Sequence, residues 1–214
     1  MLILSLDSSQ PVGSVTIARA EGGSVAIIET VQAHGGKFSA QLVPTVKRLL
    51  EAHNIEKHHI DVVAAASGPG TFTGLRVGLA AVKALAEILQ KPIVTVSVLE
   101  ALASADTARQ RVAVTEAGKG FWYAGLYGDG KGAEQHCTAD QLRELLTQHS
   151  QAAIVATQIL PGALGELGAR IVDAPISELV ARVAAGKAAR KEFTEIDALD
   201  ANYVRSDEAL YKTP

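Results

Sequence analysis

The chain is organised around the stretch Ser67-Gly68-Pro69-Gly70-Thr71-Phe72-Thr73-Gly74-Leu75-Arg76. Residues 62–66 before it form a short apolar run that is typical of a buried strand, and residues 72–90 after it predict one long helix. Gly68 and Gly70 allow backbone angles that a Cβ would forbid, and Pro69 stiffens the turn between them. The sequence therefore predicts a strand, a tight glycine-rich turn and a helix.

This turn has two interpretations. The free N–H groups at the start of a helix can bind an anion, so the turn could be a phosphate loop or the relic of one. Alternatively, the glycines let strand and helix pack closely, since a lone glycine-rich turn is a weak functional signal. No lysine follows to hold a phosphate, so we expect nucleotide affinity no tighter than roughly millimolar to high micromolar. The candidate residues of a phosphate or nucleotide loop are Asp7, Gly68, Gly70 and Thr71.

Asp7 follows the first predicted strand, at the end of a strand where parallel sheets place ligands. As a functional carboxylate it would need a phosphate or metal partner. The alternative is a turn in which Asp7, Ser8 and Ser9 satisfy the backbone with their own side chains. We also expect a hydroxyl from Thr71 or Thr73 to cap the following helix.

The long helix carries two apolar stripes, where one is enough to cover a face of a sheet. The first stripe consists of Leu75, Leu79, Val82, Ala86 and Leu89. The second stripe consists of Gly74, Gly78, Ala81, Leu85 and Ile88, and its two glycines would let another backbone come close. Either this helix is sandwiched inside the chain, or its second stripe meets another protein.

The rest of the chain predicts two α/β halves, residues 1–105 and an abbreviated second half, 106–214. In the first half we expect a strand meander, a helix over 39–53 and a strand after the long helix; the predicted strands are 2–6, 12–18, 25–31 and 93–96. A small, polar break at 103–110 separates the halves. In the second half we expect strands 111–115, 121–127 and 154–157, and helices 139–148 and 176–191.

Composition indicates a globular protein of the cytoplasm. Of the 214 residues, 48% are hydrophobic and 20% are charged, so a sizeable core can form. A formal net charge of −3 gives no footprint for direct binding of nucleic acid or a membrane. The single cysteine, Cys137, excludes an intramolecular disulfide and fits a reducing compartment. The start of the chain lacks the features of a signal peptide, and we expect no membrane helix.

The sequence offers no complete catalytic set. It has neither a Gly-Xaa-Ser-Xaa-Gly elbow nor a Gly-Xaa-Xaa-Xaa-Xaa-Gly-Lys-Ser/Thr loop. The six histidines show no helical spacing of a metal-binding pair; they are His34, His53, His58, His59, His136 and His149. We therefore expect no bound metal and no catalytic residues.

Four parts of the sequence carry a resemblance to a known family: Ile3–Ser9, Ser39 with Leu42-Val43-Pro44, Gly68–Arg76 and Val94–Ala103. Together they resemble the TsaB (YeaZ) family, the non-peptidase branch of the glycoprotease M22-like superfamily. The resemblance covers residues 1–104. It is weaker beyond, since Thr115-Glu116-Ala117-Gly118-Lys119 stands where the family has an Asp-Ala-Arg motif.

The resemblance implies an α/β fold of the actin-like and sugar-kinase-like (ASKHA) class, with two RNase H-like halves built on mixed five-stranded-type sheets. It implies a non-catalytic assembly and activating subunit in the formation of N6-threonylcarbamoyladenosine (t6A) in tRNA. The implied partners are a TsaD-like catalytic subunit and a TsaE-like ATPase, with a homodimer when the chain is alone, only indirect contact with tRNA and no membrane. No resident cofactor is implied, although weak ATP or ADP binding in the complex fits the family.

The helix stripes and the resemblance together predict an interface with the partner. Its residues are Leu42, Val46, Leu49, Gly74, Arg76, Gly78, Ala81, Leu85 and Ile88. Replacing Gly78 by arginine should then break the assembly and leave the monomer folded. The alternative functions are a nucleotide-binding ASKHA enzyme and a metal-dependent, glycoprotease-like hydrolase, which would require a phosphate cradle or metal ligands.

Overall fold

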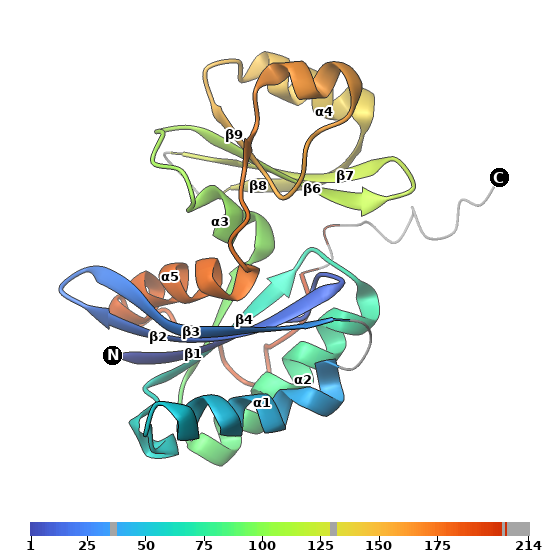
Figure 1. The fold of residues 1–214 in the computed structure, drawn as a ribbon. Coiled ribbons are helices and arrows are strands. Elements are labelled where there is room, and N and C mark those ends of the chain that lie inside the picture. The colour runs from blue at the N-terminus through green and yellow to red at the C-terminus, as the bar shows by residue number, and fades with distance from the viewer. Residues whose placement is uncertain (35–37, 129–131, 203, 205–214) are drawn as a thin grey trace. The chain divides into compact units, whose positions relative to one another are not determined.

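The computed structural model describes residues 1–34, 38–128, 132–202 and 204. The chain divides into two compact units. The first consists of Met1–Val98 and Ala174–Ala201, and the second of Leu99–Asp173 and the described residues after Ala201. Each unit contains one mixed five-stranded sheet (Figure 1).

The sheet of the first unit has the strand order β3-β2-β1-β4-β5. Its central strand, β1, pairs antiparallel with β2 and parallel with β4, and β5 continues the parallel half. The strands are β1 (Leu2–Asp7), β2 (Val12–Glu21), β3 (Ser24–His34), β4 (Val62–Gly68) and β5 (Ile93–Ser97).

Helices cover both faces of this sheet. Leu2, Leu4 and Leu6 alternate along β1 and join the hydrophobic core beneath α1 (Phe38–Ala52) and α2 (Phe72–Leu89). Figure 1 shows α1 and α2 on one side of the sheet and α5 (Ile176–Ala189) on the other. A short 3-10 helix, η1 (Lys57–His59), leads from α1 into β4.

The face under α5 is lined by small and polar residues. The Ser5 hydroxyl donates to the Ser177 carbonyl at 2.8 Å, and the Thr16 and Ser177 hydroxyls are 2.6 Å apart. Half of the buried residues of α5 are alanines, which let the helix lie close to the strands. The units therefore group α5 with the first sheet, although it lies beyond the predicted division at residues 105 and 106.

The sheet of the second unit has the order β10-β9-β6-β7-β8 and repeats the topology of the first. Its first strand, β6, pairs antiparallel with β7 and parallel with β9. The elements are α3 (Val98–Ala103), β6 (Arg111–Gly118), β7 (Phe121–Tyr127), β8 (Ala133–Thr138), α4 (Ala139–Gln148), β9 (Ala153–Ala156), η2 (Gly162–Leu167) and β10 (Arg170–Ile171). The helix α4 packs on one face of this sheet through Leu142 and Leu146.

Sequence patterns located most of these elements. The prediction omitted β8 and β10, which are the two edge strands of the second sheet. The part of the predicted second half at 205–214 lies outside the described residues. Among the residues that the structure describes, no helix combines the length and apolar character needed to cross a membrane.

Candidate functional site

Asp7 is a buried carboxyl at the carboxyl end of β1. Its Oδ1 accepts hydrogen bonds from the Ser9 N–H at 2.9 Å and the Ser9 hydroxyl at 2.6 Å. Its Oδ2 is buried and accepts no hydrogen bond from the residues that the structure describes. Burial raises the pKa of Asp7 from 3.8 to about 6, and the two hydrogen bonds from Ser9 offset only part of that rise. The predicted turn closed by Asp7 and Ser9 is confirmed.

The segment after Asp7 lies directly against the first turns of α2. The Ser9 carbonyl accepts the Thr71 N–H at 2.8 Å, and the Ser8 hydroxyl donates to the Gly74 carbonyl at 2.7 Å. Thr71 precedes α2, but its hydroxyl makes no capping hydrogen bond, so the predicted cap is wrong at this residue. The Ser9 carbonyl thus occupies the N–H of the residue that precedes the helix.

The glycines of the turn and the helix fit this contact. A Cβ on Gly70 would lie 2.5 Å from the Ser9 carbonyl oxygen, and one on Gly74 would lie well under 3.0 Å from the Ser8 carbonyl oxygen. A Cβ on Gly78 would meet the Ser8 hydroxyl at a similarly forbidden distance. Because these glycines have no Cβ, the chain's own segment after β1 can pack against them.

The structure brings some residues of the candidate phosphate loop, Asp7 and Thr71, close together. Ser9 joins Asp7 to Thr71 through hydrogen bonds, and Gly68 has a φ of 115°, a conformation that favours glycine. However, the Thr71 N–H already has a backbone partner, and a protein carbonyl lies against Gly70. Close packing accounts for Gly70, Gly74 and Gly78 without a ligand, and nucleotide binding by this loop stays a prediction.

The predicted interface residues on α1 lie in the core. Leu42, Val46 and Leu49 are buried with the sheet residues beneath α1. They therefore offer no surface to a partner and need correction as contact residues. The apolar spacing that suggested an outward face is the inward face of the helix, and Val43 between them is exposed.

The predicted second stripe of α2 also points mostly inward. Gly78 and Leu85 are buried, Gly74 and Ala81 are half-buried, and only Ile88 is exposed. Because Gly78 packs on Ser8, an arginine there would disturb the monomer itself. The predicted Gly78→Arg variant is therefore no clean test of assembly. Of the residues predicted on α2, Arg76 and Ile88 remain available at the surface.

Besides the exposed Thr73 and Glu87, the outward face of α2 contains a ridge of residues spaced by four, which we call the α2 ridge: Phe72, Arg76, Ala80, Ala84 and Ile88. Phe72 is 56% exposed and Ile88 is 68% exposed, and on α1 Val43 is 64% exposed. The Arg76 guanidinium carbon lies 3.7 Å from the centroid of the Phe72 ring. A solvated helix face normally carries charged residues, whereas this one is largely apolar.

Other chemistry is sparse in the described part of the chain. Cys137 is buried, and burial raises the pKa of its thiol to about 11, so the reactive thiolate is not formed near neutral pH. Within residues 1–34, 38–128, 132–202 and 204, no group of three or more His, Cys, Asp or Glu side chains could hold a metal ion.

Comparisons of sequence place the chain among proteins of tRNA modification. A family model described as TsaD, tRNA N6-adenosine threonylcarbamoyltransferase, matches residues 30–158. The tRNA threonylcarbamoyladenosine biosynthesis protein TsaB of Bacillus subtilis (strain 168) is 29% identical over 143 residues, which are 66% of this chain and 61% of that protein. A tRNA N6-adenosine threonylcarbamoyltransferase of Wolbachia sp. subsp. Brugia malayi is 36% identical over 93 residues, 44% of this chain but 26% of that protein.

The fold is shared with YeaZ from Pseudomonas aeruginosa, at a TM-score of 0.69 and 22% sequence identity, over 94% of this chain and 99% of that one. The predicted fold class and the predicted resemblance to TsaB (YeaZ) are confirmed. The match to TsaB spans only about three fifths of that protein's length. Because the family model covers more than half of the sequence, the chain belongs to the TsaD family, described as tRNA N6-adenosine threonylcarbamoyltransferase.

Proposed function

We propose that this protein is a non-catalytic assembly and activating subunit for t6A formation in tRNA, acting on a TsaD-like catalytic subunit. The match to TsaB supports this role, since it covers 61% of that protein, whereas the match to the Wolbachia transferase covers 26% of that enzyme. A His-Xaa-Xaa-Xaa-His motif, which the resemblance assigns to the catalytic subunit, does not occur in the sequence.

The observation that carries the proposal is the exposed apolar side chains of the α2 ridge. The two helices α1 and α2 lie side by side on one face of the first sheet (Figure 1), and Val43 is an exposed apolar residue on α1. Ala80 and Ala84 are small, so a helix of another protein can approach closely between Phe72 and Ile88. Residues spaced by four along a helix form the ridges that pack into grooves of a second helix.

This surface suits both assemblies implied by the resemblance. A second copy of the chain and the TsaD-like subunit would compete for the α2 ridge, so the homodimer would dissociate when the catalytic partner binds. A TsaE-like ATPase would then join the heterodimer, and tRNA would be reached through the complex. The Ser9 carbonyl on the Thr71 N–H supports a role in which the lone chain needs no nucleotide.

Ala84→Arg should weaken binding to the TsaD-like subunit by at least about tenfold, equal to about 1.4 kcal/mol. The new side chain would place a long charge in the middle of the α2 ridge, where the partner is expected to be apolar. Ala84 is exposed and arginine is a good helix former, so the monomer should keep its fold. Calorimetry with the partner measures affinity, and t6A formation by the reconstituted complex should fall in parallel.

The matched control is Ala189→Arg, since Ala189 is an exposed alanine at the end of α5, on the opposite face of the sheet. This variant should bind as the unchanged protein does. Normal binding by Ala84→Arg, with normal t6A formation, would show that the interface lies elsewhere. Formation of t6A by the chain alone would overturn the non-catalytic role.

A further inference from the structure

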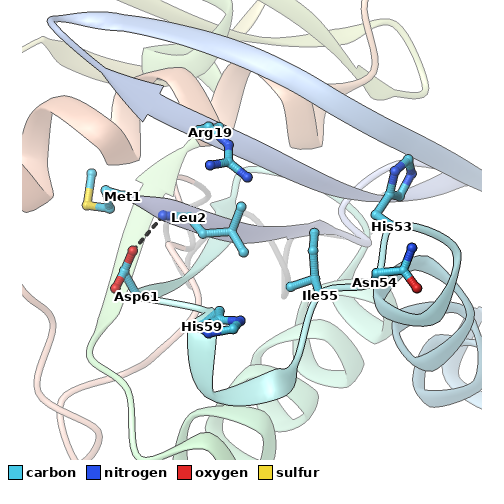
Figure 2. A pocket seen from close by; sticks show the side chains of 8 residues that line it. All are labelled: Met1, Leu2, Arg19, His53, Asn54, Ile55, His59 and Asp61. Carbon is cyan, nitrogen blue, oxygen red and sulfur yellow. Dashed lines mark hydrogen bonds between the residues drawn. The ribbon is translucent and has the colours of Figure 1, made fainter.

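A pocket of about 360 Å³ lies in the first unit, at the end of the sheet opposite to Asp7. Figure 2 shows the residues that line it: Met1, Leu2, Arg19, His53, Asn54, Ile55, His59 and Asp61. None of these residues belongs to the α2 ridge or to the glycine-rich turn. A volume of this size is at the lower end of the range of small-molecule sites.

Three separate elements bring the lining residues together. Arg19 stands opposite Leu2 in the pairing of β1 with β2. His53 and Asn54 follow α1, where Asn54 takes a positive φ of 51° and the chain turns back, with the Ile55 N–H bonded to the Leu50 carbonyl at 2.8 Å. These backbone contacts fix the pocket before any ligand arrives.

His59, the last residue of η1, and Asp61, just before β4, close the pocket from a third side. The Asp61 Oδ2 accepts the Leu2 N–H at 2.6 Å, and the Asp61 N–H donates to the Leu2 carbonyl at 2.8 Å. The carboxylate of Asp61 is thereby bound to the first residue of β1. In Figure 2, Arg19 and His59 lie on opposite sides of the pocket, with Leu2 and Ile55 between them.

Hydrogen-bond donors predominate among the polar groups of the pocket. Within the described part of the chain, the Arg19 guanidinium makes no hydrogen bond or ion pair. The His53 Nε2 donates to the Glu29 carboxylate at 2.7 Å, which orients the ring. The imidazole of His59 and the side-chain amide of Asn54 add further donors. Asp61 is the one carboxylate among the lining residues, and it already accepts a backbone N–H.

We propose that this pocket binds the phosphate group of a small phosphomonoester. A phosphate offers three strong acceptor oxygens and close to two negative charges, which match a guanidinium, the His59 imidazole and an amide better than the two oxygens of a carboxylate do. The apolar side chains of Leu2 and Ile55 would contact the carbon part of the ligand. The site is independent of the proposed role in t6A formation.

The test is a titration of the full chain with inorganic phosphate at constant pH and ionic strength, followed by amide and imidazole NMR signals. Saturable shifts are expected at Arg19, Asn54 and His59, with half-saturation in the roughly millimolar range for the bare ion. Acetate, the carboxylate comparison, should bind more weakly. Shifts centred on residues 72–74, at the start of α2, would overturn the proposal, as would shifts that do not saturate.

Two variants test whether the lining residues bind the phosphate. Arg19→Ala should weaken phosphate binding at least tenfold, while Arg143→Ala, which removes an exposed arginine from α4, should leave it unchanged. Asn54→Asp should also weaken it, because aspartate tolerates the positive φ and adds a negative charge to the pocket. Unchanged binding by both Arg19→Ala and Asn54→Asp would contradict the site.

Discussion

Asp7→Asn is expected to raise the free energy of unfolding of the first unit at pH 7 by up to about 3 kcal/mol. The carboxyl is buried, and its pKa of about 6 in the folded chain compares with 3.8 for the ordinary group. At 1.36 kcal/mol for each pH unit, that difference corresponds to about 3 kcal/mol against the ionised form. Asparagine keeps an oxygen for the two hydrogen bonds from Ser9 and carries no charge. Its amide has no partner at the position of Oδ2, so 3 kcal/mol is the upper bound.

The increase in the free energy of unfolding caused by Asp7→Asn should grow as the pH rises. Because the pKa of Asp7 is raised by folding, its neutral form stabilises the folded state fully below about pH 4, and this stabilisation is lost as the pH rises through about 6. The variant has no such loss. The difference between the two proteins should therefore be close to zero below pH 4, grow between pH 4 and 6, and stay constant above.

Hydrogen exchange of the β1 and β4 amides measures this effect, because it reports the unit that holds Asp7. Trp122, the single tryptophan, lies in the second unit, so its fluorescence serves as an internal reference that should not change. Asp197→Asn, at an exposed aspartate of the same unit, is the matched control and should leave the exchange of these amides unchanged. If the Asp7→Asn variant and the unchanged protein had equal free energies of unfolding at pH 7, ionisation of Asp7 would not cost the folded state any stability.

The strand, turn and helix around residues 62–89 could be predicted from the sequence because local signals agree there. An apolar run, two glycines with a proline and a helical apolar spacing each point to the same element. The helices α1 and α4 follow from leucine spacing in the same way. The turn at Asp7 could also be predicted, since an aspartate side chain commonly accepts the backbone N–H two residues later.

The orientation of the second stripe of α2 could not be predicted. A glycine spaced by four from another glycine indicates that a backbone comes close, but not which backbone. In this fold the close segment is Ser8–Ser9 of the same chain, which pairs with Gly74 and Thr71 across more than 60 positions of sequence. The exposed face of α2 is consequently not the second stripe but the α2 ridge, whose Ala80 and Ala84 precede Ala81 and Leu85 of that stripe by one residue.

The edge strand β8 escaped prediction because it lacks an apolar pattern. It reads Ala-Glu-Gln-His-Cys-Thr over Ala133–Thr138, and only Cys137 is buried. Its other residues are held by pairing with β7, as Tyr123 with His136. The sheet that α5 covers could not be predicted either. Its buried alanines, Ala181, Ala184 and Ala188, do not indicate which of the two sheets the helix packs on.

Gly74→Ala should destabilise the first unit by about 3 kcal/mol, the upper end of the usual effect of overpacking. The added Cβ would lie well under 3.0 Å from the Ser8 carbonyl oxygen and 2.5 Å from the Thr71 hydroxyl oxygen. The nearer atom belongs to the backbone, so no side-chain rotation relieves the clash. The segment after β1 would have to move away from α2, and the hydrogen bond from the Ser8 hydroxyl to the Gly74 carbonyl would be strained or lost.

Gly186→Ala is the matched control, since it makes the same change inside α5 and should have the opposite sign. Its Cβ would lie 3.5 Å from a guanidinium nitrogen of Arg190, an ordinary contact, and alanine favours a helix over glycine by roughly 0.5–1 kcal/mol. Hydrogen exchange of the β1 amides should thus be faster in Gly74→Ala and no faster in Gly186→Ala than in the unchanged protein. If Gly74→Ala instead stabilised the unit as Gly186→Ala does, Ser8 and α2 would not be in contact, and the glycines of α2 would again be available to a partner.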